Sequence, residues 1–278
     1  MEKINKLKVS ILMPTYNRAD RIGKAIKSVI NQSFKEWELL IVDNESTDKT
    51  EDVVQSFIKN DNRIRYLNVK KSPNPGIADY LNYGINISHG DYIARLDDDD
   101  EWYDYDKLKK QVDFLEENGD FVLVGGGAIV VDDDGKEIYR FYKRETDEEI
   151  RNKALYACPF VHSNVLFRKE TVQKTVGYKN IRFGEDWELW LRLGKMGRLY
   201  NFKEYFSLYL NSGQNFSIKN QRFVGKTVLG LIKEYRRDYP NYRKAYILNL
   251  IQYLYSFTPS FIKSITQNFL FYIKRNYF

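Results

Sequence analysis

Residues 9–43, VSILMPTYNRADRIGKAIKSVINQSFKEWELLIVD, decide the fold. They contain two short, continuous apolar runs, 9–14 and 38–43, and this pattern is typical of strands that are buried on both faces. Between the two runs, apolar side chains recur at the spacing of one helix face: Ile22, Ile26, Val29 and Ile30. Asp20 stands where it can cap this helix. The stretch therefore predicts two parallel strands joined by a right-handed helical crossover.

The same alternation of strands and helices continues along the chain. Asp48 and Glu51 have capping-box spacing before a second helix, and the stretch 64–69 has the pattern of a third strand. A third helix is expected after Gly76, and YIARLD (92–97) has the pattern of a fourth strand. We therefore predict an α/β fold with a mostly parallel central sheet flanked by helices.

Polar residues gather where the predicted strands end. Asp43 ends the second strand, Asn74 and Gly76 follow the third, and the run 97–99 ends the fourth. In parallel sheets, ligands bind outside the carboxyl ends of the strands. We therefore expect these residues to meet at one edge of the sheet and to form the binding site.

The acidic run at 97–100 predicts the chemistry of this edge. Four adjacent carboxylates repel one another, so they require a nearby positive charge, part of which Arg95 can supply. Mg²⁺ and Mn²⁺ prefer oxygen ligands, usually one or two carboxylates together with substrate phosphates, which favours a metal–diphosphate site. A solvated acidic turn is the alternative. A calcium loop is excluded, because Trp102 stands where that loop requires glycine.

The second half of the chain has a less regular pattern. It predicts helices over 108–119 and 184–197, a short helix capped by Thr146 with Glu149, and a further strand over 162–168. A strand and a hairpin that turns at Asp134-Gly135 are predicted over the range 121–138.

Composition limits the classes of protein. The chain has 278 residues, of which 43% are hydrophobic and 29% charged, as in globular proteins with a core. The net charge of +6 favours acidic partners, but no nucleic-acid-binding motif is present. The single cysteine, Cys158, excludes an intrachain disulfide and fits a reducing compartment. No signal peptide and no membrane-spanning window of about 18 apolar residues is recognised, so we expect a cytoplasmic protein.

Four segments, in this order, resemble the family 2 glycosyltransferases: VSILMPTYNRADRIGKAIKSVINQSF, WELLIVDNESTDKT, NPGIADYLNYGINISHGDYIARLDDDDEW and FGEDWELWLRL. The resemblance covers residues 8–210 and implies the A-type glycosyltransferase fold, in which a Rossmann-like sheet is joined to an acceptor region. It implies a glycosyltransferase domain over 1–215, with nucleotide-sugar binding in 1–100 and acceptor contacts in 101–215. The implied reaction moves a sugar from a nucleotide-sugar to an acceptor with inversion, assisted by Mn²⁺ or Mg²⁺.

The resemblance also implies roles for single residues. Nucleotide contacts are expected from the ends of the first three strands: Pro14, Thr15, Tyr16, Asp43, Asn74 and Gly76. Tyr16 would stack on the base, and Asp43 would accept a hydrogen bond from a uracil N–H. Asp97 and Asp98 would hold the ribose and the diphosphate, and Asp99 would be the direct metal ligand. Plain packing of Tyr16 and a loop-capping role for Asp43 are the alternatives.

The pair Glu185-Asp186 resembles the catalytic-base motif of the family. An acceptor hydroxyl must lose its proton as it attacks the anomeric carbon. Neighbouring helix positions point about 100° apart, so one of the two acids should face the sugar. The resemblance favours Asp186 as the base and Glu185 as an acceptor contact, although two acids can also simply stabilise a helix start. His162 is either a structural residue or lies near the acceptor or the metal.

Two departures from the family pattern concern the nucleotide. Asn44-Glu45-Ser46 stands where the family often has Asp-Gly-Ser, and Leu81 lies near the position of a frequent arginine. The resemblance therefore favours UDP, with dTDP and GDP as alternatives.

The C-terminal stretch 216–278 predicts a helical extension that is aromatic and basic, with no acidic residue after Asp238. Its last part, 260–278, has apolar residues at helical spacing beside basic ones: Ile262, Ile265, Phe269, Tyr272 and Ile273. This pattern fits peripheral contact with a membrane, packing on the same domain, or a homodimer interface equally well.

The expected function is sugar transfer to a saccharide or lipid-linked saccharide acceptor in surface polysaccharide biosynthesis, at the inner face of the cell membrane. A nucleotidyltransferase is one rival, but PTYNRAD (14–20) lacks the glycines of a phosphate loop, although Arg18 is present. A non-catalytic nucleotide- or sugar-binding protein is the other rival, and it has no need for acids at both 97–99 and 185–186.

Overall fold

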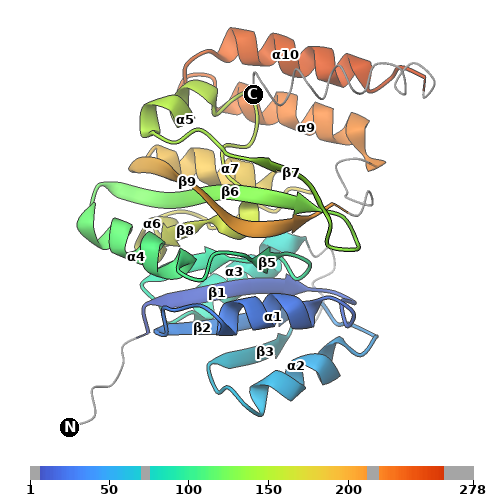
Figure 1. Ribbon diagram of the computed structural model, residues 1–278. Coiled ribbons are helices and arrows are strands. Elements are labelled where there is room, and N and C mark those ends of the chain that lie inside the picture. The colour runs from blue at the N-terminus through green and yellow to red at the C-terminus, as the bar shows by residue number, and fades with distance from the viewer. Residues whose placement is uncertain (1–6, 70–75, 212–218, 260–278) are drawn as a thin grey trace.

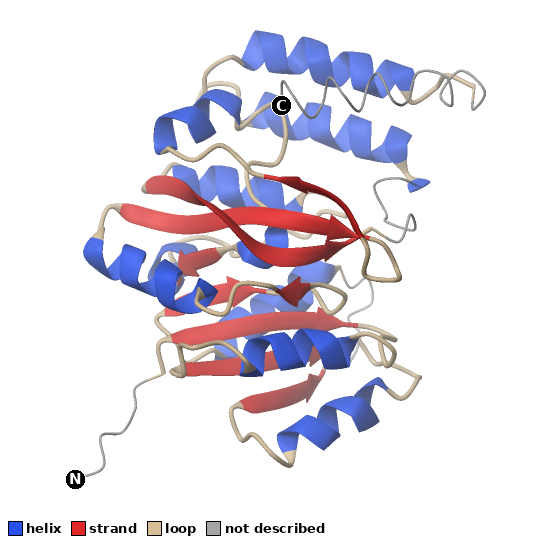
Figure 2. Ribbon diagram, viewed as in Figure 1, coloured by secondary structure: helices blue, strands red, loops and turns tan. Residues whose placement is uncertain are grey.

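A computed structural model of the chain describes residues 7–69, 76–211 and 219–259 (Figure 1). Its strands form one nine-stranded sheet, flanked by helices (Figure 2). The strands are β1 Val9–Thr15, β2 Trp37–Asp43, β3 Ile64–Asn68, β4 Tyr92–Arg95, β5 Glu101–Trp102, β6 Phe121–Val131, β7 Glu137–Phe141, β8 Leu166–Arg168 and β9 Arg198–Leu210. The helices are α1 Ile22–Ile30, α2 Thr50–Ile58, α3 Ile77–Ile87, α4 Lys107–Glu117, α5 Asp147–Lys153, α6 Lys169–Gln173, α7 Glu185–Gly194, α9 Gln221–Glu234 and α10 Tyr242–Tyr255, with a 3₁₀ turn at His162–Asn164.

The first four strands form the predicted parallel half of the sheet. Their order is β3-β2-β1-β4, and every neighbouring pair is parallel. Thr15 at the end of β1 lies opposite Asp43 at the end of β2. The carboxyl ends of these strands therefore meet at one edge, as expected from the sequence.

The second half of the sheet is mixed. Strand β8 is antiparallel to both β4 and β6, whereas β6 and β9 are parallel. Strand β5, directly after the acidic run, pairs with β9 in antiparallel fashion. This pairing brings the far end of β9 next to the acidic run, although the two are about a hundred residues apart in sequence.

Helices cover both faces of the sheet. Alternate residues of β1 point to opposite faces: Val9, Ile11 and Met13 pack with α1, α2 and α4, while Leu12 packs with α3, α6 and α7. Helices α9 and α10 form a further layer beyond α7 (Figure 1), where Trp187 and Leu191 share an apolar cluster with Val228 and Leu231 of α9. The C-terminal helices are thus packed onto the core through α7.

Membrane spans were predicted to be absent. Among the described helices, none is both long enough and apolar enough to cross a bilayer. The apolar stretch 260–278 lies outside the described residues.

Some local predictions hold and others need correction. The predicted Thr146–Glu149 capping box is formed, and the predicted helix over 184–197 is present as α7, Glu185–Gly194, which buries Trp187 and Trp190. Asp20 does not cap α1, because the helix begins one residue further along and Arg21 occupies the cap position. Strand β8 is shorter than predicted, since His162–Asn164 forms a 3₁₀ turn.

The predicted capping box between Asp48 and Glu51 is wrong. Helix α2 begins at Thr50, with Lys49 at its cap position and no side-chain cap bond. The Asp48 carboxylate instead accepts hydrogen bonds from the backbone N–H groups of Thr50 (2.9 Å) and Ala19 (3.1 Å). It therefore joins the loop after β2 to the loop after β1, a tertiary contact that the local spacing could not reveal.

The Asn44-Glu45-Ser46 departure has a conformational consequence. Glu45 has a φ of 53°, in the left-handed region, and so has Asn17 in the loop after β1, with a φ of 52°. Asparagine tolerates this region, whereas a glutamate pays about 1 to 2 kcal/mol for it. A glycine, which the family often has at this position, adopts a positive φ without this cost.

Candidate active site

A large cavity lies at the carboxyl edge of the parallel strands. Its volume is about 1090 Å³, the size expected for a nucleotide-sugar site. Residues from the ends of β1, β2 and β9, from α3 and from the acidic run line it: Pro14, Thr15, Tyr16, Asn17, Arg18, Asp20, Arg21, Val42, Asn44, Gly76, Ile77, Tyr80, Asp97, Asp98, Asp99, Asp100, Asp133, Phe183, Tyr209, Leu210, Lys219 and Asn220. The lining thus combines aromatic and aliphatic side chains with the four carboxylates of the acidic run.

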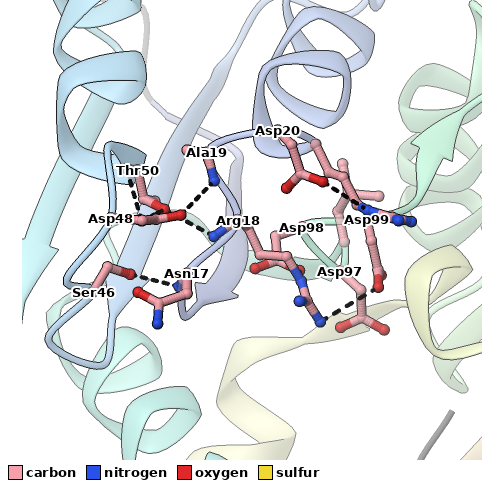
Figure 3. Close-up of polar contacts among 12 residues, drawn as sticks. Asn17, Arg18, Ala19, Asp20, Ser46, Asp48, Thr50, Asp97, Asp98 and Asp99 are labelled. Carbon is pink, nitrogen blue, oxygen red and sulfur yellow. Dashed lines mark hydrogen bonds and ion pairs between the residues drawn. The ribbon is translucent and has the colours of Figure 1, made fainter. Parts of the chain in front are cut away.

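Two interlocked loops fix one rim of the cavity. The backbone N–H of Asn17 donates to Ser46 Oγ (2.8 Å), and the backbone N–H of Arg18 donates to Thr50 Oγ1 (2.8 Å). These contacts hold the loop after β1 against the loop after β2 (Figure 3). As a result, the side chain of Arg18 points across the cavity rim toward the acidic run.

Arg18 is the nearest protein cation to two of the aspartates. Its Nε lies 3.3 Å from Asp98 Oδ1, and one of its terminal nitrogens lies 3.8 Å from Asp99 Oδ2 (Figure 3). Burial, with the charge of Asp99 adding to it, raises the pKa of Asp98 to about 7, and burial also raises the pKa of Asp99. The charges of Arg18 and, for Asp99, of Arg21 therefore do not offset the effect of burial on these two carboxylates.

The two outer aspartates of the run have protein partners of their own. Arg95, which is fully buried, donates to Asp97 Oδ1 (2.6 Å), and although burial acts in the opposite direction, this guanidinium holds the pKa of Asp97 below its usual value. Asp100 accepts from Ser163 Oγ (2.5 Å) and from the backbone N–H of Leu210 (3.0 Å). Asp100 therefore ties the acidic run to the 3₁₀ turn and to the end of β9.

The donor chemistry fits a hard divalent cation. Asp98 and Asp99 supply carboxylate oxygens that the protein only partly neutralises, and the side chain of Asp99 is 33% exposed to the cavity. Among the described residues, no cluster of three or more acidic, histidine or cysteine side chains is arranged to hold a metal by itself. Such a set of one or two carboxylates suits an ion that takes its remaining ligands from substrate phosphates and water.

The second acidic pair lies in the first turn of α7. Asp186 Oδ1 accepts from the backbone N–H of Trp187 (2.7 Å), and its Oδ2 faces His162 Nδ1 at 3.9 Å and Cys158 Sγ at 3.7 Å. Burial and the charge of Asp186 raise the pKa of Glu185 to about 7. The charge of Asp97 adds to this shift, so the pair and the acidic run act on one another electrostatically.

The structure brings most of the predicted site residues to one place. Pro14, Thr15, Tyr16 and Gly76 line the cavity with the aspartates of the run, and the exposed fraction of Tyr16 is 46%. Asn74 lies outside the described residues. Glu185 and Asp186 are not among the residues that line the cavity, whereas Phe183, two residues before Glu185, is.

Asp43 lies beneath the cavity wall. It is fully buried and accepts hydrogen bonds from the backbone N–H of Ser46 (2.8 Å) and from the Tyr66 hydroxyl (2.5 Å). A direct bond from Asp43 to a nucleotide base therefore requires the Ser46 loop to move. The neighbouring Asn44 lies in the wall itself and accepts a hydrogen bond from the hydroxyl of Tyr80, another lining residue.

Several lining residues were not predicted as site residues. Arg18 stood in the sequence directly after Tyr16 and Asn17, at a strand end, and this position was the available signal. Tyr80 of α3 is 4% exposed, and no local pattern distinguishes it from a core residue. Tyr209 and Leu210 could not be found from local patterns, because only the β5–β9 pairing brings them to the cavity.

Comparisons with known proteins agree with this architecture. The chain matches the glycosyl transferase family 2 over residues 10–176, more than half of its length. EpsE of Bacillus subtilis is 33% identical over 222 residues, covering 78% of this chain and 77% of EpsE. The GalNAc(5)-diNAcBac-PP-undecaprenol beta-1,3-glucosyltransferase of Campylobacter jejuni is 30% identical, covering 71% of this chain and 63% of that protein. Three longer relatives from Rickettsia are 31 to 33% identical, and the chain spans 30 to 36% of their length.

Solved structures show the same fold. S. aureus TarS in complex with UDP-GlcNAc aligns with a TM-score of 0.67 at 18% identity, over 93% of this chain and 75% of that one. The mannosyltransferase PcManGT of Pyrobaculum calidifontis, in complex with GDP-Man and Mn²⁺, aligns with a TM-score of 0.64 at 16% identity, over 97% of this chain and 81% of that one. The chain therefore belongs to glycosyltransferase family 2, a family of enzymes, and has their A-type fold.

Proposed function

We propose that the protein is a metal-dependent, inverting glycosyltransferase that uses a UDP-sugar. The observation that carries this proposal is the lining of the large cavity at the sheet edge. It combines aromatic and aliphatic side chains suited to a nucleoside with two carboxylates, Asp98 and Asp99, whose ion pairs among the described residues are both with Arg18. A nucleoside diphosphate bound with a divalent cation suits both kinds of lining.

The chain's own residues divide the work on the donor. Tyr16 offers an exposed ring for stacking on the base, while Pro14, Thr15 and Gly76 complete the wall near it. Asp97 and Asp98 hold the ribose and the diphosphate side, and Arg18 can exchange its aspartate partners for phosphate oxygens. Asp99 would hold Mn²⁺ or Mg²⁺, which when bound offsets the negative charge of the diphosphate leaving group.

The acceptor is activated by the pair on α7. We assign Asp186 the role of general base, which takes the proton from the acceptor hydroxyl as that oxygen attacks the anomeric carbon. The attack comes from the face opposite the nucleotide, so the configuration at that carbon inverts. Glu185, one position earlier on the helix, contacts the acceptor.

Donor binding tests this function directly. Titrating the protein with UDP, dTDP and GDP in a calorimeter, with Mn²⁺, Mg²⁺ or neither, is expected to give manganese- or magnesium-dependent binding of UDP. Release of UDP from UDP-glucose, UDP-galactose and UDP-GlcNAc then identifies the sugar. A preference for GDP or dTDP would replace UDP as the proposed donor nucleotide. If a folded protein binds none of the three nucleotides, the transferase assignment is refuted.

We further propose a lipid-linked saccharide as the acceptor and the inner face of the cell membrane as the place of action. The Campylobacter relative is named for an undecaprenol-linked acceptor. Helix α10 carries an exposed apolar stripe, in which Ile247, Ile251 and Leu254 are 55 to 58% exposed. The stripe lies beside Arg243 and Lys244, in a stretch without acidic residues after Asp238, and this combination suits an anionic lipid surface.

A vesicle assay tests the membrane contact. Ile247→Ser combined with Leu254→Ser is expected to lower the affinity for phosphatidylglycerol vesicles about tenfold, because two exposed side chains no longer enter the lipid interface. Val176→Ser removes a 73%-exposed valine elsewhere and is the matched control. One contradicting result is that the wild type, the α10 double variant and Val176→Ser bind the vesicles equally well. Another is that binding does not depend on salt or on the charge of the lipid. Either result would contradict a role for the stripe. If the wild type is a dimer and the α10 variant a monomer, the stripe would instead be an interface with a second copy of the chain.

A further inference from the structure

His162 connects the two acidic groups of the site. Its ring lies between Arg95, at the end of β4, and Asp186, in the first turn of α7, and its side chain is 17% exposed. Trp190 and Tyr178 pack against the ring, with centroid distances of 6.0 and 6.3 Å. The imidazole is thus held in place from several sides, and its two nitrogens face opposite partners.

The proton on the His162 ring can be assigned from Arg95. The Nε of Arg95 lies 3.1 Å from His162 Nε2, and the other guanidinium nitrogens donate to Leu12 O (2.8 Å) and Asp97 Oδ1 (2.6 Å). A guanidinium can only donate hydrogen bonds, so His162 Nε2 must accept with its lone pair. A neutral imidazole then carries its proton on Nδ1, the nitrogen that faces Asp186.

The same geometry opposes a charged ring. A protonated imidazole would place an N–H on Nε2, directly against the Nε–H of Arg95. Burial and the charge of Arg95 lower the pKa of His162 and outweigh the charges of Asp97 and Asp186, which act in the opposite direction. The lowered pKa agrees with this clash of donors. A neutral His162 therefore has its Nδ1–H on the side of Asp186, whose Oδ1 accepts from the helix backbone and whose Oδ2 accepts from Cys158 Sγ (3.7 Å).

We propose that His162 is a positioning residue that aims the Asp186 carboxylate, and that Arg95 holds it in the required tautomer. The 3.9 Å between His162 Nδ1 and Asp186 Oδ2 is longer than a hydrogen bond, and such contacts in unliganded sites shorten when substrate binds. Because Arg95 also holds Asp97, one chain of contacts links the donor side of the cavity with the proposed base: Asp97, Arg95, His162 and Asp186. The inference rests on the proposed function through the role of Asp186.

The tautomer can be measured without any substrate. The protein has two histidines, so ¹⁵N-histidine labelling gives signals from His89 and His162 alone, and His162→Gln assigns them. Near neutral pH, the His162 ring is expected to be neutral with its proton on Nδ1. A ring that is charged, or protonated on Nε2, would overturn the inference.

Two substitutions separate the two faces of the ring. In His162→Gln the amide oxygen can replace Nε2 as the acceptor for Arg95, but no donor remains at the Nδ1 position. In His162→Asn the amide nitrogen can replace Nδ1, but Arg95 loses its acceptor. For a positioning residue, His162→Gln lowers kcat for UDP release from a UDP-sugar about 10- to 100-fold at unchanged KM, and His162→Asn is the milder variant.

A merely structural histidine predicts the reverse order. The bond from the buried Arg95 would then matter most, so His162→Asn would be the more damaging variant and would also lose thermal stability. Asp186→Asn, assayed in parallel, keeps the two proposals apart. An inactive Asp186→Asn beside a fully active His162→Gln refutes the positioning role alone, whereas an active Asp186→Asn refutes the proposed base.

Discussion

Asp186→Asn is expected to lower kcat for sugar transfer about 1,000-fold while donor affinity stays within about twofold of the wild-type value. Asparagine keeps the size of the side chain and can still accept from the Trp187 backbone N–H, so the helix start is preserved. It cannot take a proton from the acceptor. Initial rates at saturating donor and acceptor, with calorimetric binding of UDP as the test of an intact donor site, measure the two quantities separately. A variant that keeps more than a tenth of the wild-type kcat would contradict the assignment.

Glu185→Gln is the matched control for this experiment. Glu185 is a chemical competitor for the role of base, because burial and the charge of Asp186 raise its pKa to about 7, close to the value that suits a base at neutral pH. We expect Glu185→Gln to lower kcat about tenfold or less. Below about pH 7 the wild-type Glu185 carries a proton and resembles glutamine, so the variant should differ from wild type less in mild acid than in mild base. A larger loss in Glu185→Gln than in Asp186→Asn would exchange the two roles.

The parallel half of the fold follows from local pattern. The runs at 9–14 and 38–43 are apolar apart from Ser10, Glu38 and Asp43, because both faces of β1 and β2 are covered by helices. The resulting register puts Thr15 beside Asp43. Once these strands are parallel, their polar ends must share an edge. The location of the candidate binding site could therefore be predicted from the sequence before any family resemblance was considered.

The mixed half could not be derived in this way. Strand β8 has three residues and β5 has two, so neither carries a periodic pattern long enough to set its partners or direction. Asp100 is an example of a contact that local patterns cannot predict. Its hydrogen-bond partners Ser163 and Leu210 lie 63 and 110 positions away in the sequence. The wall formed by the end of β9 depends on such long-range contacts, and so its residues were missed.

The contact chain through His162 was hidden for the same reason. Arg95 was expected to balance the acids, and it does bind Asp97, but its second bond goes to a residue 67 positions away. His162 itself interrupts the predicted strand, because the 3₁₀ turn that carries it replaces the strand's first half. The 3₁₀ turn that interrupts the predicted strand thus carries the residue that lies between Arg95, which binds Asp97, and Asp186.

The aspartates of the run are close in sequence but not equivalent in the structure. Asp97 is bound to Arg95, and Asp100 accepts a hydrogen bond from Ser163. Asp98 and Asp99 share Arg18, and Asp99 is the more exposed of the two, with 33% of its side chain accessible against 11% for Asp98. Asp99 is therefore the carboxylate best placed to contact a cation that arrives with the donor.

Asp99→Ala is expected to abolish the metal-dependent part of donor binding. In the presence of Mn²⁺, the affinity for UDP should fall on the order of 100-fold, since losing one partner of a charged contact costs about 2 to 5 kcal/mol. Without metal, the affinity should stay the same or rise, because one carboxylate that repels the diphosphate is gone. This opposite response to metal distinguishes the loss of a ligand from a collapsed site, and calorimetry of UDP with and without Mn²⁺ measures both arms.

Two further variants test whether the charge and the position of Asp99 are responsible for the metal dependence. Asp99→Asn keeps the size of the side chain but removes its charge, so it should resemble Asp99→Ala in its response to Mn²⁺. Asp20→Ala removes another acid at the cavity, one whose side chain is 72% exposed and paired with Arg21, and its metal-dependent affinity should stay within about twofold of wild type. If Asp20→Ala loses as much affinity as Asp99→Ala, the metal responds to the general negative potential of the cavity. Asp99 then has no special place among the acids of the run.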